Sequence, residues 1–129
     1  MYKVDVESNV EAGAPQFTVK VPGYEFFIDT KGKGVTPPDA LLAGLGSCVG
    51  VYIRKYAHGA GLPLDKFVIT VEAEFCQEAP VRFKSINVSI DLKGNVLDER
   101  RKRAFLEFVK NCPVHNTLKN NPDVEVKIL

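Results

Sequence analysis

Alternation of apolar and polar residues dominates the first part of the chain. Apolar side chains recur at every second position in three short runs, near residues 2–7, 17–21 and 24–28. This is the period of a strand with one buried face. Turn signals that contain glycine and proline separate the runs. The pattern therefore predicts a three-stranded antiparallel meander whose first strand is half-buried.

A helical period begins after Thr36. Thr36 is suited to cap a helix and Pro37 to occupy its first position, and the helix is expected to reach about His58. The apolar stripe predicted for this helix is Leu41, Leu45, Cys48 and Tyr52. A long helix with so few polar residues needs cover on several sides, which favours a homodimer.

Small residues form a strip beside that stripe. The strip consists of Ala43, Gly44, Gly46, Ser47 and Gly50. Each glycine inside a helix costs about 0.5–1 kcal/mol relative to alanine. The strip therefore predicts that another backbone packs very closely there, or that access to the helix has to stay open.

The remainder of the chain predicts two strands, a second helix and a last strand. The strands are expected over 67–76 and 86–92, the helix over 97–111, and Pro113 should end or kink it just after Cys112. The last strand would carry Val124, Val126 and Ile128. The order βββ-α-ββ-α-β belongs to the α+β class, with antiparallel sheets around two helices. A chain of 129 residues is expected to form one domain, residues 1–129.

Composition restricts the possible partners and the compartment. The formal net charge is +1, from 17 basic and 16 acidic residues, which argues against nucleic acid and against an anionic membrane surface. No apolar run is long enough to span a membrane, and the N-terminus lacks the apolar core of a signal peptide. We therefore expect a cytoplasmic protein, in which thiols stay reduced unless they do redox work.

The three cysteines leave alternatives open when only their positions are considered. Cys48 is either a small buried hydrophobic residue or a reactive thiol. Cys112 is either a core residue at a helix end or a resolving cysteine that the proline break frees to move. Cys76 falls on the polar face of its strand and has no evident role. Three scattered cysteines do not supply the ligands of a zinc site.

Two segments resemble motifs of the OsmC/Ohr family (osmotically induced protein C and organic hydroperoxide resistance protein). TPPDALLAGLGSC over residues 36–48 is similar to the central-helix motif of that family, and NCPVHNTL over residues 111–118 is similar to its second-cysteine motif. The resemblance implies an intertwined homodimer with active sites at the subunit interface. It also implies a thiol peroxidase in which Cys48 attacks a small apolar hydroperoxide and Cys112 then forms a disulfide with it. A dithiol would reduce that disulfide, and the resemblance implies that no metal or organic cofactor is needed.

The chain departs from the characterised branches of that family at two places. Pro38 stands where those branches have a glutamate, so Asp39 becomes the candidate supporting carboxylate. No arginine precedes Arg54, whereas those branches use an N-terminal arginine to stabilise the thiolate. We expect Tyr52 and Leu45 to line the substrate pocket. The missing arginine keeps open a non-enzymatic redox-sensing or apolar-ligand-binding module. A structural or interaction protein with inert core cysteines is the third hypothesis.

Overall fold

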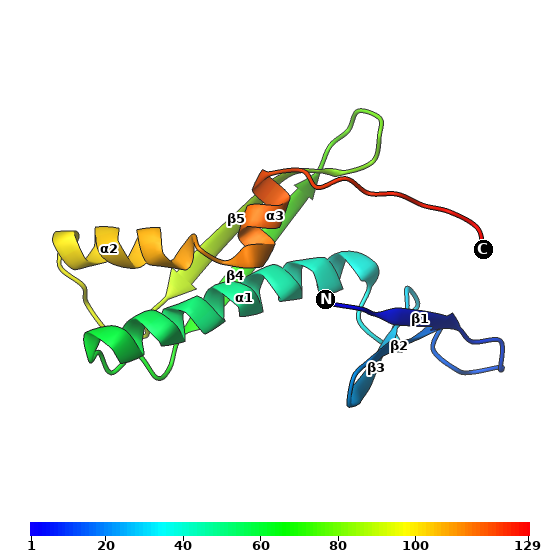
Figure 1. Cartoon of the computed structure of the whole chain (residues 1–129), viewed down its shortest axis with the longest axis horizontal. Helices are drawn as coiled ribbons and strands as arrows, with labels where there is room; N and C mark the ends of the chain where they lie inside the picture. Colours follow the sequence, from blue (N-terminus) through cyan, green and yellow to red (C-terminus); the bar gives the residue numbers. More distant parts are fainter. The chain divides into compact units, whose positions relative to one another are not determined.

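The computed structural model describes all 129 residues, which form two compact units, residues 1–41 and 42–129 (Figure 1). The elements, in chain order, are β1 (Asp5–Ser8), β2 (Phe17–Val21), β3 (Tyr24–Ile28), α1 (Pro37–Ala60), β4 (Val68–Phe75), β5 (Phe83–Asp91), α2 (Glu99–Val109) and α3 (Pro113–Lys119). Both sheets are antiparallel, which confirms the α+β class. None of the helices combines the length and the apolar character that a membrane span requires.

The first unit contains the predicted meander, with strand order β1-β2-β3. Val19 pairs with Val6 on one side and with Phe26 on the other. Gly23 takes a φ of 79° in the hairpin between β2 and β3, a conformation that glycine adopts without steric cost. The expectation of a half-buried first strand was wrong: every residue of β1 is exposed, and Val6 keeps 59% of its surface accessible. No element of this chain covers that strand.

A buried carboxylate organises the loop that follows β3. Asp29 is only 2% exposed, and its two oxygens accept hydrogen bonds from the backbone N–H groups of Gln16, Lys31 and Lys33 at 2.9–3.0 Å. These backbone donors, with that of Lys33 first, hold the pKa of Asp29 below its ordinary value of 3.8. The charged carboxylate therefore fixes the loop that leads to α1.

Helix α1 has the predicted start and a well-defined end. The Thr36 hydroxyl accepts a hydrogen bond from the backbone N–H of Asp39 at 3.2 Å, as expected of a cap. At the other end Gly61 has a φ of 65°, and the N–H of Leu62 donates to the carbonyl of Ala57 at 2.8 Å. This is the hydrogen bond of a Schellman cap. The helix ends at Ala60, two residues beyond the predicted limit of His58.

The core of the second unit lies between α1, α2 and the β4–β5 hairpin. Its buried members are Leu45, Val49, Ile53, Ala57, Leu64, Phe105, Val109 and Cys112. The predicted apolar stripe of α1 is therefore displaced around the helix: Leu45 is buried as expected, but Leu41 is exposed, and Cys48 and Tyr52 lie at the margin of the core. Almost every residue of this helix is apolar or small, so periodicity alone could not identify the buried face.

The region after α2 differs from the prediction. Asp98 caps α2 by accepting the N–H of Arg101 at 2.7 Å, and the helix ends at Val109. Cys112 is not its last residue. It is the N-cap of a further short helix, α3, in which Pro113 occupies the first position. Proline is favourable there because the first helical N–H has no partner within the helix.

The predicted last strand does not form in this chain. The residues after α3 have no regular secondary structure, and Val126 is 90% exposed. The alternation of apolar and polar residues is present in the sequence, but a strand also needs a neighbouring strand for its backbone hydrogen bonds. Neither β1–β3 nor β4–β5 provides that neighbour.

Candidate functional site

Two thiols that are far apart in the sequence meet at the margin of the second unit's core. Cys112 belongs to the buried cluster, and Cys48, from the middle of α1, packs against that cluster. The Cys48 thiol lies close enough to Cys112 to raise the pKa of the Cys112 thiol. Both cysteines are free thiols. The arrangement brings a helix-borne thiol and a thiol from the α2–α3 junction together, as a nucleophile and a resolving cysteine require.

The two thiols have different environments. Cys112 is 0% exposed, whereas Cys48 is half-buried and keeps some access to solvent. Burial raises the pKa of Cys112 above its ordinary value of 9.0, and the neighbouring Cys48 raises it further. The backbone N–H groups of His115 and Val114 oppose this rise but do not cancel it. Cys112 is therefore a protonated thiol at neutral pH, while Cys48 has the access that a nucleophile needs.

Helix α3 begins directly at the second thiol. The Cys112 Sγ accepts a hydrogen bond from the backbone N–H of His115 at 3.4 Å, the contact that an N-cap makes three residues into a helix. The His115 ring is half-buried, and its Nδ1 is buried with no hydrogen-bond partner. Sequence reasoning gave His115 no role.

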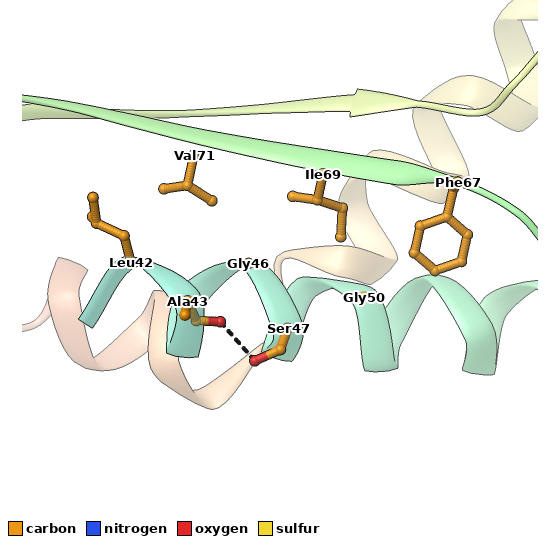
Figure 2. Close-up of a pocket in the computed structure, with 8 residues that line it drawn as sticks. All are labelled: Leu42, Ala43, Gly46, Ser47, Gly50, Phe67, Ile69 and Val71. Atoms are coloured by element: carbon orange, nitrogen blue, oxygen red, sulfur yellow. Dashed lines mark hydrogen bonds between the residues drawn. The ribbon is translucent and has the colours of Figure 1, made fainter. Parts of the chain in front are cut away.

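The small-residue strip of α1 faces strand β4. A Cβ placed on Gly46 would lie 3.0 Å from the Val71 side chain, and one on Gly50 would lie 3.3 Å from that of Ile69. Figure 2 shows these side chains of β4 pointing at the helix. The predicted close approach is therefore present, although side chains rather than another backbone make it.

A shallow groove of about 420 Å³ runs along this helix–strand contact. It is lined by Leu42, Ala43, Gly46, Ser47, Gly50, Phe67, Ile69 and Val71 (Figure 2). The Ser47 hydroxyl donates its proton within the helix, to the Ala43 carbonyl at 2.7 Å, and only its oxygen remains to accept a hydrogen bond. Neither Cys48 nor Cys112 lines the groove, so it is separate from the thiol pair.

The other candidate residues have diverse surroundings. Tyr52 is half-buried one turn after Cys48, with its ring 6.0 Å from that of Phe108 and with the Lys55 ammonium 4.6 Å above it. Leu45 is 3% exposed and belongs to the core. Asp39 is exposed in the first turn of α1. The roles expected of these residues in substrate binding and in support of the thiolate stay predictions.

Cys76 follows the last residue of β4. It is half-buried, and its backbone N–H donates to the Arg82 carbonyl at 2.7 Å across the β4–β5 connection. It is not among the side chains of the core cluster or of the shell that packs against it. The chain also contains no group of three or more His, Cys, Asp or Glu side chains that could hold a metal ion. Cys76 is therefore separate from the pair formed by Cys48 and Cys112.

Comparison with known proteins points to one family. A family model described as OsmC-like protein matches residues 30–127. The hydroperoxide reductase of Mycoplasma genitalium is 28% identical over 102 residues, which cover 76% of this chain and 72% of that protein.

Solved structures share the fold. The OsmC-like protein from Mycoplasma pneumoniae is 23% identical, with a TM-score of 0.77 over 94% of this chain and 89% of that one. The organic hydroperoxide resistance protein OsmC from Legionella pneumophila is 18% identical, with a TM-score of 0.64 over 97% of this chain and 93% of that one. At these identities the likeness establishes the fold alone.

Proposed function

We propose a function from the premise that this chain belongs to the family of OsmC-like proteins, whose model matches residues 30–127. The function is that of a cysteine-dependent thiol peroxidase that reduces organic hydroperoxides. The name of the Mycoplasma genitalium relative, hydroperoxide reductase, supports a peroxide-related redox role. The observation that carries the proposal is the pairing of two free thiols with unequal burial, Cys48 and Cys112.

The first step takes place at Cys48. Its thiolate attacks the terminal oxygen of the hydroperoxide, the O–O bond breaks, and the leaving alkoxide takes up a proton to become an alcohol. Cys48 is oxidised to a sulfenic acid. The partial exposure of Cys48 supports this role, because the peroxide has to reach the sulfur.

The second step takes place at Cys112. Its sulfur attacks the sulfenic sulfur of Cys48, the S–O bond breaks, and water leaves as the disulfide forms. An external dithiol then reduces the disulfide by thiol–disulfide exchange and restores both thiols. The full burial of Cys112 supports a resolving role, because a thiol that solvent does not reach is protected from direct oxidation.

The proposed substrate is a small apolar hydroperoxide. Tyr52 lies one turn after Cys48 on α1, and its ring is 6.0 Å from that of Phe108. Aromatic and aliphatic surroundings favour an organic hydroperoxide over hydrogen peroxide, because binding then removes apolar surface from water.

We also propose that the protein acts as a homodimer. Large apolar side chains are exposed in both units of this chain, among them Phe27, Val6 and Val126. Large apolar side chains left exposed in this number are typical of a chain that associates with a partner. Light scattering coupled to size-exclusion chromatography should give twice the mass of 14.2 kDa. A mass equal to that of one chain at micromolar concentration would contradict the dimer, while leaving the thiol chemistry to be tested separately.

The direct test is turnover of cumene hydroperoxide with dihydrolipoamide as the dithiol. We expect Cys48→Ser to abolish turnover and Cys112→Ser to reduce it severely. Cys76→Ser is the matched control and should turn over at the rate of the unmodified protein. The unmodified protein could show no more turnover than Cys48→Ser and still form a slow, reversible Cys48–Cys112 disulfide. That result would exclude the peroxidase function and favour the redox-sensing module.

Mass spectrometry tests the order of the two steps. After exposure to the peroxide, Cys112→Ser should carry added oxygen on Cys48, because no thiol remains to condense with the sulfenic acid. Cys48→Ser should carry none on Cys112, because the buried thiol does not meet the peroxide. Oxygen on Cys112 in that variant would reverse the two roles.

A further inference from the structure

Helix α3 depends on the sulfur atom that the proposed resolving step oxidises. Its N-cap is the Sγ of Cys112, which accepts a hydrogen bond from the backbone N–H of His115 at 3.4 Å. An N-cap provides a partner for one of the backbone donors that the first turn of a helix leaves unpaired, and its loss weakens the helix. In the proposed resolving step the same sulfur bonds to Cys48. One atom is therefore both a structural acceptor and a redox group.

Few other interactions hold α3 in place. None of its seven residues is buried, and residues 116–119 are exposed. Val114, in the first turn, packs against the core cluster. A helix of this length is also well below the roughly 12–15 residues at which isolated helices become even marginally stable in water. The stability of α3 therefore depends on its first turn, where the cap by Cys112 and the packing of Val114 attach it to the core.

Cys48 is held more firmly than Cys112. It lies in the middle of α1, a helix of 24 residues, whereas Cys112 joins two helices and has a non-helical backbone with φ −54° and ψ 120°. Both are free thiols, so their sulfur atoms have to move together before they can bond. Movement of the junction between α2 and α3 is the less costly route, because a shift of Cys48 would disturb a helix that is packed into the core. The Cys112 sulfur then leaves the N–H of His115.

We propose that formation of the Cys48–Cys112 disulfide removes the cap of α3 and releases this helix from the core. The oxidant is the organic hydroperoxide: its O–O bond breaks, the two thiols together lose two electrons and two protons, and one alcohol and one water molecule form. Release opens the surroundings of a sulfur that is 0% exposed in the reduced protein, so the dithiol can reach the disulfide. Reduction restores the cap. This inference rests on the disulfide of the function proposed above.

Amide hydrogen exchange of the reduced and the oxidised protein, followed by NMR, tests the release. The disulfide is formed with diamide, and mass spectrometry verifies its pairing. The amides of His115 and Asn116, which donate to Cys112, should exchange about fivefold faster or more, which corresponds to the ~1 kcal/mol of a typical N-cap. The amides of α2 should exchange at the same rate or more slowly, because a cross-link restrains the unfolded chain. Unchanged or slower exchange in α3 would overturn the proposal.

Substitutions of Cys112 test the cap without an oxidant. Cys112→Ala removes the acceptor and should show the fast exchange of α3 in reducing buffer. Cys112→Ser is the matched control, because serine is a good N-cap, and its α3 should exchange as slowly as in the reduced unmodified protein. Exchange in α2, whose cap Asp98 is untouched, corrects for any change in overall stability. Equal exchange of α3 in the two variants would reject the proposal. Should Cys112→Ala fail to fold, the two redox states of the unmodified protein decide.

Two oxidants separate the release of α3 from the peroxidase activity. If cumene hydroperoxide leaves both thiols reduced, while diamide forms the disulfide and speeds exchange in α3, the peroxidase fails and the release of α3 stands. If the hydroperoxide forms the disulfide and α3 stays protected, the peroxidase stands and the release fails. If neither oxidant links Cys48 to Cys112, both proposals are overturned.

Discussion

The two compact units of this chain are ordered by different interactions. Residues 42–129 bury a connected apolar cluster around Ile53, which is 0% exposed. Residues 1–41 bury only Val19 and the carboxylate of Asp29. The first unit is therefore held by strand pairing and by hydrogen bonds to one charged group, and the second by removal of apolar surface from water. The thiol pair lies in the unit that has a packed core, where side-chain positions are closely determined.

The largest predicted effect is a cavity in the core of the second unit. Ile53→Ala should lower the free energy of unfolding by about 2–5 kcal/mol, because it removes buried methyl and methylene groups and leaves a void. Circular dichroism during urea denaturation measures the change. Val19→Ala, the corresponding truncation in the first unit, should cost less. An equal or greater loss at Val19 would mean that the first unit also depends on apolar packing.

The next effect concerns the contact between α1 and β4. Gly46→Val should destabilise the protein by about 1–3 kcal/mol, since the first added carbon would already lie 3.0 Å from Val71. Gly59→Val is the matched control, because a Cβ at that position meets nothing within 4 Å. Both melting temperatures can be measured in one experiment. Similar losses at the two sites would indicate that helix propensity alone, and not the approach of β4, explains the glycine at position 46.

A smaller and local effect is expected at Asp29. Its pKa is lowered, so the charged carboxylate stabilises the folded state above pH 3.8, and this contribution is lost as the pH falls through the lowered value. Hydrogen exchange at the amides of Lys31 and Lys33 should therefore become faster on acidification. Asp29→Asn should show fast exchange there already at neutral pH. Asp91→Asn is the control, because that exposed carboxylate accepts the N–H of Lys93 in another loop. Slow exchange at both amides in Asp29→Asn would show that the carboxylate does not fix the loop.

The smallest effect should come from the ion pair of the first sheet. Lys20 and Glu7 lie 2.9 Å apart across β1 and β2, and both side chains are about half exposed. Exposed pairs of this kind contribute little to stability because solvent screens them. Lys20→Gln should leave the melting temperature unchanged within experimental error, in low and in high salt. A clear, salt-sensitive decrease would show that side-chain charges help to hold the sheet.

Elements with a strong local signal could be predicted from the sequence. The meander follows from alternation and from the Pro22-Gly23 turn, and the start of α1 follows from Thr36 and Pro37. The prediction of a last strand was wrong, although Val124, Val126 and Ile128 alternate with polar residues as they would in a strand. Pairing partners are not encoded in a local pattern, and no sheet of this chain accepts that segment.

The sequence predicted only part of the candidate site. The resemblance of two motifs singled out Cys48 and Cys112, and the structure places them side by side. Their catalytic roles stay predictions. The role of Cys112 as the cap of α3 was missed, because Pro113 was interpreted as the end of one helix rather than the beginning of another.

Local features of the sequence predict the order of most elements, their approximate limits and the positions of the two cysteine motifs. These depend on residues that are neighbours along the chain, where periodicity and capping act directly. Packing between distant segments selects the buried face of α1 and the glycines that meet β4. The same packing encloses Cys112 and leaves Cys48 accessible. Because α1 is apolar on nearly all sides, its own sequence does not identify the buried face. The β4–β5 hairpin and α2, which come from distant parts of the chain, pack against one face and bury it.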